Sequence, residues 1–242
     1  KIYPSLNQTT STQSQRWRET PYQQSQVSSA NIFQVTKSTD LLPFQLVYRH
    51  LAFLPISHVN NHYEVTAMET LSEASRKHFL LLDEFYQKTQ KSAAKNKTLK
   101  QSLTYGNKLS NPALLAPLKV IYPVGGSYSK AALIRDPDCI IDVTFYYLTP
   151  ESEHEAYYLL GWLNSSILHE NLPRVCSVGA GGSIRVIHMT PWLFPLPKFQ
   201  PENSVHQKIS SVSKQCEEKV QQLYLSSNLV KPDGPHWSNK RA

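Results

Sequence analysis

The sequence predicts an α+β fold: a mixed or antiparallel sheet with packed helices and a C-terminal helical arm. Three observations predict it. Short runs of β-branched and aromatic residues, broken by polar turns, occur in residues 31–67 and 118–148. Apolar residues form helix-type faces in 70–91 and 153–169. A final segment, 204–225, repeats apolar residues every three or four positions, as a packed helix does.

The chain of 242 residues is long enough for one large domain with tails. Residues 1–30 are rich in Gln, Ser and Thr, which predicts a flexible tail or linker. We expect a main domain over 31–200, a C-terminal helix over 201–227 and a tail over 228–242.

The first strands are expected at Ile32–Val35, Phe44–Leu54 and His62–Met68, the last of which alternates apolar and polar residues. Asn60-Asn61 indicates a tight turn before it. Thr70 and Glu73 have the spacing of a capping box.

That box predicts a helix that ends near Lys91, followed by a loop over 92–116. Strands are expected to resume at Leu118–Tyr122, Ala131–Ile134 and Ile140–Leu148. The last is almost continuously apolar, which predicts a central strand buried on both faces.

Gly125-Gly126 marks a turn between the first two of these strands. Ser152 and Glu155 form a second capping-box pattern, which predicts a buried helix over Glu153–His169. A glycine-rich loop at Val178–Ser183 and a strand at Ile184–His188 are expected to follow. In the final helix, the apolar seam that includes Val205 and Val212 is expected to pack on a neighbouring helix.

Positive charge is concentrated in one interval. The net charge is +7, and no acidic residue occurs between Glu84 and Asp136. An acid-free interval of this length is typical of a surface that binds a polyanion. The lysines beyond the predicted helix, among them Lys95, Lys97, Lys100 and Lys108, lack a role at a helix terminus. The alternative is a solvated loop whose lysines serve solubility.

Several functional classes have little support in the sequence. No apolar run approaches the length of a membrane span, and no secretory signal is visible. Three widely spaced cysteines without a C-x-x-C pair favour a reducing compartment, so the expected location is the cytoplasm. The histidines lack metal-binding spacing, and nuclease and serine-hydrolase motifs are absent. We therefore expect no catalysis and no metal site in this chain.

An ordered set of motifs lies in residues 155–199. An apolar run ends in Leu163-Asn164-Ser165, and a glycine cluster with Arg185 follows. The set closes on Pro195-Leu196-Pro197. This order resembles the C-terminal target-recognition (specificity) domain of bacterial N6-adenine DNA methyltransferases and restriction-modification enzymes. With the preceding apolar strands, the resemblance covers roughly residues 115–225.

The resemblance implies that 31–200 is a DNA target-recognition domain whose partners are double-stranded DNA and a methyltransferase catalytic domain or subunit. The methyltransferase tetrapeptide Asn/Asp-Pro-Pro-Tyr/Phe is absent, and its nearest match is Asn111–Leu114. We therefore expect a non-catalytic chain, either a fragment of such an enzyme or a subunit for it. No cofactor is expected here, and S-adenosylmethionine would bind the separate catalytic domain.

The expected DNA-binding residues combine phosphate-binding lysines, groups beside the Gly125-Gly126 turn, and the glycine loop with its flanks. They are Lys95, Lys97, Lys100, Lys108, Tyr122, Ser127, Tyr128, Lys130, Gly181, Gly182, Arg185 and His188. Alternatively, Arg185 is salt-bridged and the loop merely connects two elements. Two other functions stay open: a protein-interaction or scaffold module that docks through the C-terminal helix, and RNA binding.

Overall fold

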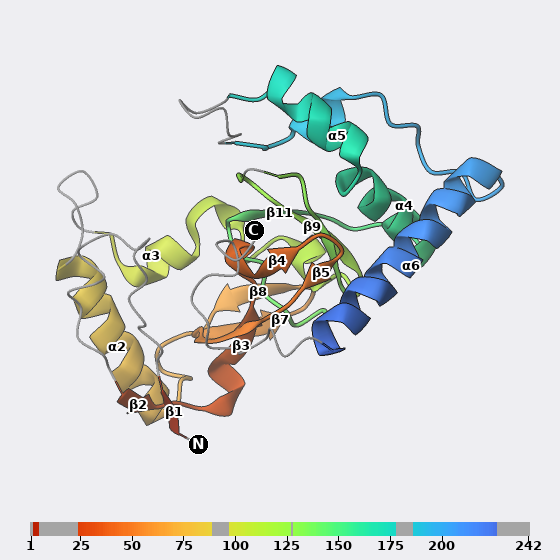
Figure 1. Cartoon of the computed structure of the whole chain (residues 1–242). Helices are drawn as coiled ribbons and strands as arrows, with labels where there is room; N and C mark the ends of the chain where they lie inside the picture. Colours follow the sequence, from red (N-terminus) through yellow and green to blue (C-terminus); the bar gives the residue numbers. More distant parts are fainter. Residues whose placement is uncertain (1, 5–23, 89–96, 127, 178–185, 227–242) are drawn as a thin grey trace. The chain divides into compact units, whose positions relative to one another are not determined.

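The computed structural model has an α+β fold with small sheets and a long C-terminal helix, which confirms the predicted fold class (Figure 1). The structure describes residues 2–4, 24–88, 97–126, 128–177 and 186–226. The chain forms two compact units, so the predicted single domain over 31–200 contributes to both. Unit 1 comprises residues 1–34 and 51–115, and unit 2 comprises 35–50 and 116–242.

The described residues of unit 1 form the strand pairs β1 with β2, β3 with β6 and β7 with β8, together with the helices α2 and α3. Their bounds are β1 Ile2–Pro4, β2 Gln24–Gln26, β3 Ile32–Val35, β6 His50–Phe53, β7 Ile56–Val59, β8 His62–Val65, α2 Glu73–Lys88 and α3 Leu99–Leu103. Short 3-10 turns, η1 Ser29–Asn31, η4 Tyr105–Asn107 and η5 Pro112–Leu115, connect them.

The turn predicted at Asn60-Asn61 is confirmed. It closes the antiparallel β7–β8 hairpin, and Asn60 adopts a left-handed φ of 54°, which asparagine tolerates better than most residues. The long strand predicted at Phe44–Leu54 is instead broken. Phe44 has a φ of 65°, and β5 and β6 are separate strands on either side of Val47–Arg49.

Two other predictions for unit 1 are corrected. Residues 24–30, assigned to the tail, pack into the unit: Val27 is buried, and the Ser28 N–H donates to Ser75 Oγ over 3.0 Å. Helix α2 begins at Glu73, where Ser72 Oγ, rather than the predicted Thr70, accepts from a backbone N–H of the first turn. Thr70 instead donates to the Ala67 carbonyl.

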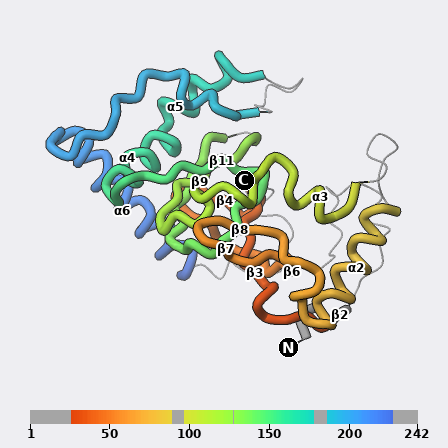
Figure 2. Tube along the Cα trace, turned by 180° about the vertical axis from the view of Figure 1, so that it is seen from behind, coloured from red at the N-terminus to blue at the C-terminus, as the bar shows by residue number. Residues whose placement is uncertain are grey.

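The predicted loop over 92–116 contains helix α3. Thr98 caps it by accepting from Gln101 N, while the Gln101 side chain accepts from Thr98 N. This capping box fixes a helix of only five residues, too short to show apolar periodicity in the sequence. Figure 2 shows α3 beside the C-terminal half of α2.

Unit 2 is built on an antiparallel three-stranded sheet in the order β10-β9-β11, with helices α4, α5 and α6. The bounds are η2 Ser38–Asp40, β4 Leu41–Leu42, β5 Gln45–Leu46, β9 Lys119–Pro123, β10 Ala132–Ile134, β11 Phe145–Leu148, α4 Glu153–Leu163, α5 Ser166–Asn171, η6 Leu172–Arg174, η7 Thr190–Leu193 and α6 Ser204–Ser226.

The central strand of this sheet is β9, in which all five residues are buried. The prediction of a central strand over Ile140–Leu148 is wrong, because β11 covers only its last four residues and lies at the edge. A turn precedes the strand. The Asp142 carbonyl accepts a hydrogen bond from Phe145 N, and the Asp142 side chain accepts one from Thr144 N.

The Leu163-Asn164-Ser165 motif divides the predicted helix 153–169 into α4 and α5. Asn164 accepts from Ala131 N and donates to the carbonyls of Ala131 and Leu160. Ser165 then caps α5 by accepting from Leu168 N. Asparagine here ties the end of α4 to the start of β10, which explains the motif on structural grounds.

Helix α6 packs against α4 (Figure 1), but only part of the predicted seam, including Ile209, lies against it. The buried residues of α6 are His206, Ser210 and Ser213, whereas Val205 and Val212 are exposed. The two helices approach closely at Gly161 of α4, where a built Cβ would lie 2.3 Å from Ser213 Oγ and 2.9 Å from Ile209 Cγ2. Glycine at this position therefore permits the observed approach of α6.

Within the described parts of the chain, no helix is both long enough and apolar enough to cross a membrane.

Candidate nucleic-acid interface

Several cations of the acid-free interval serve the protein itself. Lys88 pairs with Glu84 one turn earlier in α2. Lys130 is half-buried, and its ammonium donates to the Leu41 carbonyl over 2.6 Å. Lys130 thus has a structural contact with β4, and its predicted contact with DNA stays a prediction.

Lys119, in the central strand, is the most deeply placed of these cations. Its side chain is inaccessible to solvent, and Nζ donates to the carbonyls of Ala116 and Asp136 over 2.9 and 3.0 Å. Burial lowers the pKa of this ammonium, while nearby Cys139 and Asp136 act in the opposite direction. Lys119 is a structural cation that cannot reach a ligand in solution.

Arg135 joins the end of β10 to α6. Its guanidinium donates to both carboxylate oxygens of Glu217 over 3.0 Å, and Tyr157 Oη donates to the same carboxylate over 2.7 Å. The hydrogen bond to Glu217 is the main reason that the pKa of Arg135 is raised. Burial, followed by the bond to Glu217, raises the pKa of Tyr157. This charge therefore stabilises unit 2.

The remaining lysines of the predicted site that the structure describes in unit 1 are exposed around α3. Lys97 precedes the helix, Lys100 lies within it and Lys108 follows η4. Lys97 Nζ is 5.3 Å from the ring centroid of Tyr105, whose exposed fraction is 67%. We call Lys97, Lys100, Tyr105 and Lys108 the α3 patch. Lys95, also predicted, lies outside the described residues.

A second polar surface, in unit 2, lies where β9 and β11 meet the segment that follows residue 185. Tyr122 and Tyr146 are directly opposite in the strand register, and their rings stack at 5.5 Å. Trp192 Nε1 donates to Tyr122 Oη over 3.0 Å, and Tyr146 Oη lies 3.0 Å from His188 Nδ1. We call Tyr122, Tyr146, His188 and Trp192 the aromatic edge.

Tyr122 is the buried base of this edge and not a DNA contact. Its exposed fraction is 1%, and burial raises the pKa of its phenol, partly offset by the bond from Trp192. The prediction of a direct contact by Tyr122 is therefore corrected, because a base or phosphate cannot reach this side chain. His188, by contrast, is exposed at the solvent end of the same network.

Backbone contacts hold His188 firmly. The N–H groups of Ile187 and His188 both donate to the Val124 carbonyl, over 2.8 and 3.0 Å. His188 also has a φ of 43°, in the left-handed region that few residues other than glycine adopt. Such conformations persist where surrounding contacts impose them, and they are concentrated at functional sites.

The other predicted residues of unit 2 divide into two groups. Tyr128 is exposed and stacks on His169, with ring centroids 4.6 Å apart. Ser127, Gly181, Gly182 and Arg185 lie outside the described residues.

Sequence reasoning missed Tyr105 and Tyr146. Tyr105 was detectable, because an aromatic residue among lysines in an acid-free interval is a common arrangement at nucleic-acid interfaces. Tyr146 was not, because its importance depends on the register between β9 and β11 and on a hydrogen bond to a residue 42 positions later.

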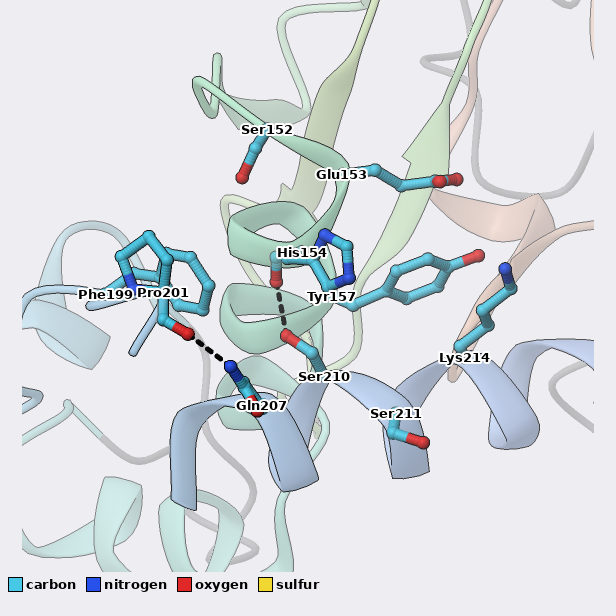
Figure 3. Close-up of a pocket in the computed structure, with 10 residues that line it drawn as sticks. All are labelled: Ser152, Glu153, His154, Tyr157, Phe199, Pro201, Gln207, Ser210, Ser211 and Lys214. Carbon is cyan, nitrogen blue, oxygen red and sulfur yellow. Dashed lines mark hydrogen bonds between the residues drawn. The ribbon is translucent and has the colours of Figure 1, made fainter. Parts of the chain in front are cut away.

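A cavity of about 710 Å³ in unit 2, between the start of α4, Phe199–Pro201 and α6, contains none of the predicted residues (Figure 3). Its polar walls largely satisfy one another. Ser210 donates to the His154 carbonyl, Gln207 to the Pro201 carbonyl, and Ser152 caps α4. These contacts involve three of its polar lining residues, and Ser211 and Lys214 also line the cavity.

Comparison with known proteins gave no match to any protein-family model or to any curated protein.

Proposed function

We propose that this chain is a non-catalytic module that recognises double-stranded DNA in a sequence-specific manner. In this proposal it serves an N6-adenine DNA methyltransferase or restriction-modification enzyme, and S-adenosylmethionine binds a separate catalytic domain or subunit. The observation that carries the proposal is the α3 patch. After the structural cations are set aside, Lys97, Lys100 and Lys108 are exposed in a segment without acidic residues.

The α3 patch has the chemistry of a phosphate-binding surface. Duplex DNA carries closely spaced negative charges, and lysines that neutralise them release condensed counterions. Tyr105 lies beside Lys97 and presents a ring that can contact sugar or base. A surface serving solubility alone would not require an exposed aromatic ring of this size.

The motifs that carry the family resemblance support the sequence-specific part of the proposal. Asn164 fixes the end of α4 to β10, and Tyr158 Oη donates to the Pro197 carbonyl of the Pro-x-Pro stretch. These motifs anchor the chain on both sides of residues 178–185 and His188. Their role as a rigid frame agrees with the general rule that recognition residues occur on segments positioned by a scaffold.

The test is the salt dependence of binding to a random-sequence duplex. In the test variant, Lys97, Lys100 and Lys108 are replaced by Gln. The control variant carries the same replacement at three exposed lysines of α6, Lys208, Lys214 and Lys219. Both variants lose the same net charge, so a difference between them reports contact rather than overall charge.

Each lost phosphate contact should lower the slope of log affinity against log salt by about 0.9. We expect a clearly shallower slope for the patch variant and a nearly unchanged one for the α6 control. Equal slopes for the two variants would contradict the proposal. Absence of duplex binding by the wild type would favour the alternative of a protein-interaction module.

A further inference from the structure

The aromatic edge ends in a single histidine whose ring orientation is fixed by a tyrosine. We propose that His188 donates from Nε2–H to an acceptor atom on a DNA base edge, and that Tyr146 is the positioning residue that fixes this tautomer. The inference rests on the proposed function, and it names a specificity-determining residue within it.

The first step is the tautomer. Tyr146 Oη and His188 Nδ1 are 3.0 Å apart, a normal hydrogen-bond distance. A phenol is a stronger hydrogen-bond donor than a neutral imidazole N–H, because its proton is more acidic. Tyr146 therefore donates, Nδ1 accepts, and the ring proton of His188 is carried by Nε2.

The second step is rigidity. Tyr146 is stacked on the buried Tyr122, which is fixed by Trp192. The backbone of His188 is pinned to Val124 at the end of β9. The imidazole is thus held from two sides, its ring through Nδ1 and its main chain through N–H, so an outward donor at Nε2 needs little ordering on binding.

The third step is the kind of acceptor. Val124 and Tyr146, which hydrogen-bond to His188, are uncharged, and the next residue, Met189, is an exposed apolar side chain. A single directional N–H donor beside uncharged groups and an apolar side chain suits a base edge better than a phosphate, which is usually bound by cations. In the major groove the acceptors are purine N7, guanine O6 and thymine O4.

Two measurements test the inference. The ring-nitrogen chemical shifts of His188, measured by NMR at pH 8, report the tautomer in the free protein. Selection from a random duplex pool then gives the consensus for wild type, His188→Ala, His188→Asn and Tyr146→Phe. Asparagine is included because it tolerates the left-handed backbone. Tyr147→Phe is the matched control, since it removes the hydroxyl of the adjacent residue, which points to the opposite face of β11.

We expect the Nε2–H tautomer in the wild type and a mixture in Tyr146→Phe. Both His188 variants should lose discrimination at one base position by about 3- to 10-fold, the value of one neutral hydrogen bond. Tyr146→Phe should lose less at the same position, and Tyr147→Phe should lose none. Replacing the purine at that position by its 7-deaza analogue, or guanine or thymine by an analogue without the O6 or O4 acceptor, identifies the atom read.

Two results would overturn the inference while leaving DNA recognition intact. One is a wild-type consensus that both folded His188 variants recover unchanged. The other is an Nδ1–H tautomer in the wild type. A wild type that selects no consensus from the pool would instead overturn sequence-specific recognition itself.

Discussion

The α3 patch and the aromatic edge differ in the chemistry of the groups they expose. Lys97, Lys100 and Lys108 are exposed cations on long side chains, and Lys97 Nζ lies 5.3 Å from the ring centroid of Tyr105. His188 is fixed through both its ring and its backbone. Exposed cations suit phosphates, which look alike in every sequence, whereas a donor fixed through its ring and backbone can distinguish bases. The contrast predicts that the α3 patch contributes mainly to affinity for DNA and the aromatic edge mainly to sequence specificity.

The largest expected effect concerns Asn164, which ties the end of α4 to the start of β10. Asn164→Ala removes three hydrogen bonds to main-chain groups and leaves the N–H of the buried Ala131 without its acceptor. We expect a loss of about 2–3 kcal/mol in the free energy of unfolding, measured in urea. Asn171→Ala is the control: its side chain makes one exposed bond, to the Ile167 carbonyl, so its cost should be about 0.5 kcal/mol or less.

A second test introduces a larger side chain where α4 packs against α6. Gly161→Ala would place a Cβ against Ser213 Oγ and Ile209 Cγ2. We expect a destabilisation of about 1–3 kcal/mol, as for other overpacked sites. Adding Ser213→Ala removes the nearest atom and should recover part of the loss. A Gly161→Ala protein as stable as the wild type would show that the helices do not cross so closely.

A smaller effect is expected in the α3 patch. Tyr105→Leu removes an exposed ring that can contact sugar or base, and such a contact contributes on the order of 1 kcal/mol, so duplex affinity should fall by about 5-fold. Tyr105→Phe keeps the ring and should bind as the wild type does. If both variants bind duplex DNA more weakly than the wild type and to the same extent, the phenol hydroxyl rather than the ring contributes to affinity.

The smallest expected effect tests whether an exposed side chain can be replaced with little loss of stability. Val212 of α6 has an exposed fraction of 50%, so Val212→Asp should change the free energy of unfolding by only about 0.5 kcal/mol. A loss of about 2 kcal/mol or more would show that the valine seam is covered after all. Thermal unfolding, combined with the oligomeric mass in solution, measures both possibilities.

The sequence was sufficient where one element carries its own pattern. The Asn60-Asn61 turn, strand β8, helix α2 and the long helix α6 follow from turn residues and periodicity. The sequence was insufficient where contacts with other elements determine which residues become buried. The residues of α6 that become buried are His206, Ser210 and Ser213, and no periodicity in α6 alone indicates this. Ser213 lies beside Gly161, whereas His206 packs on Tyr158.

The same limit applies to the site. A count of lysines could not separate Lys119 and Lys130, which bind carbonyls, from Lys100 and Lys108, which stay exposed, because that depends on the strand pairing around β9. Likewise Tyr122 looked accessible beside a glycine turn, whereas the stack with Tyr146 and the bond from Trp192 place it in the core.

The central claim is that affinity and base reading reside in different surfaces, and one paired measurement tests it directly. The salt slope and the selected consensus are determined for the triple Gln variant of Lys97, Lys100 and Lys108 and for His188→Ala. The account predicts that the lysine variant has a shallower slope with the wild-type consensus, and that His188→Ala has the wild-type slope with discrimination lost at one position. Lysine replacements that change the consensus while the slope stays the same would contradict it.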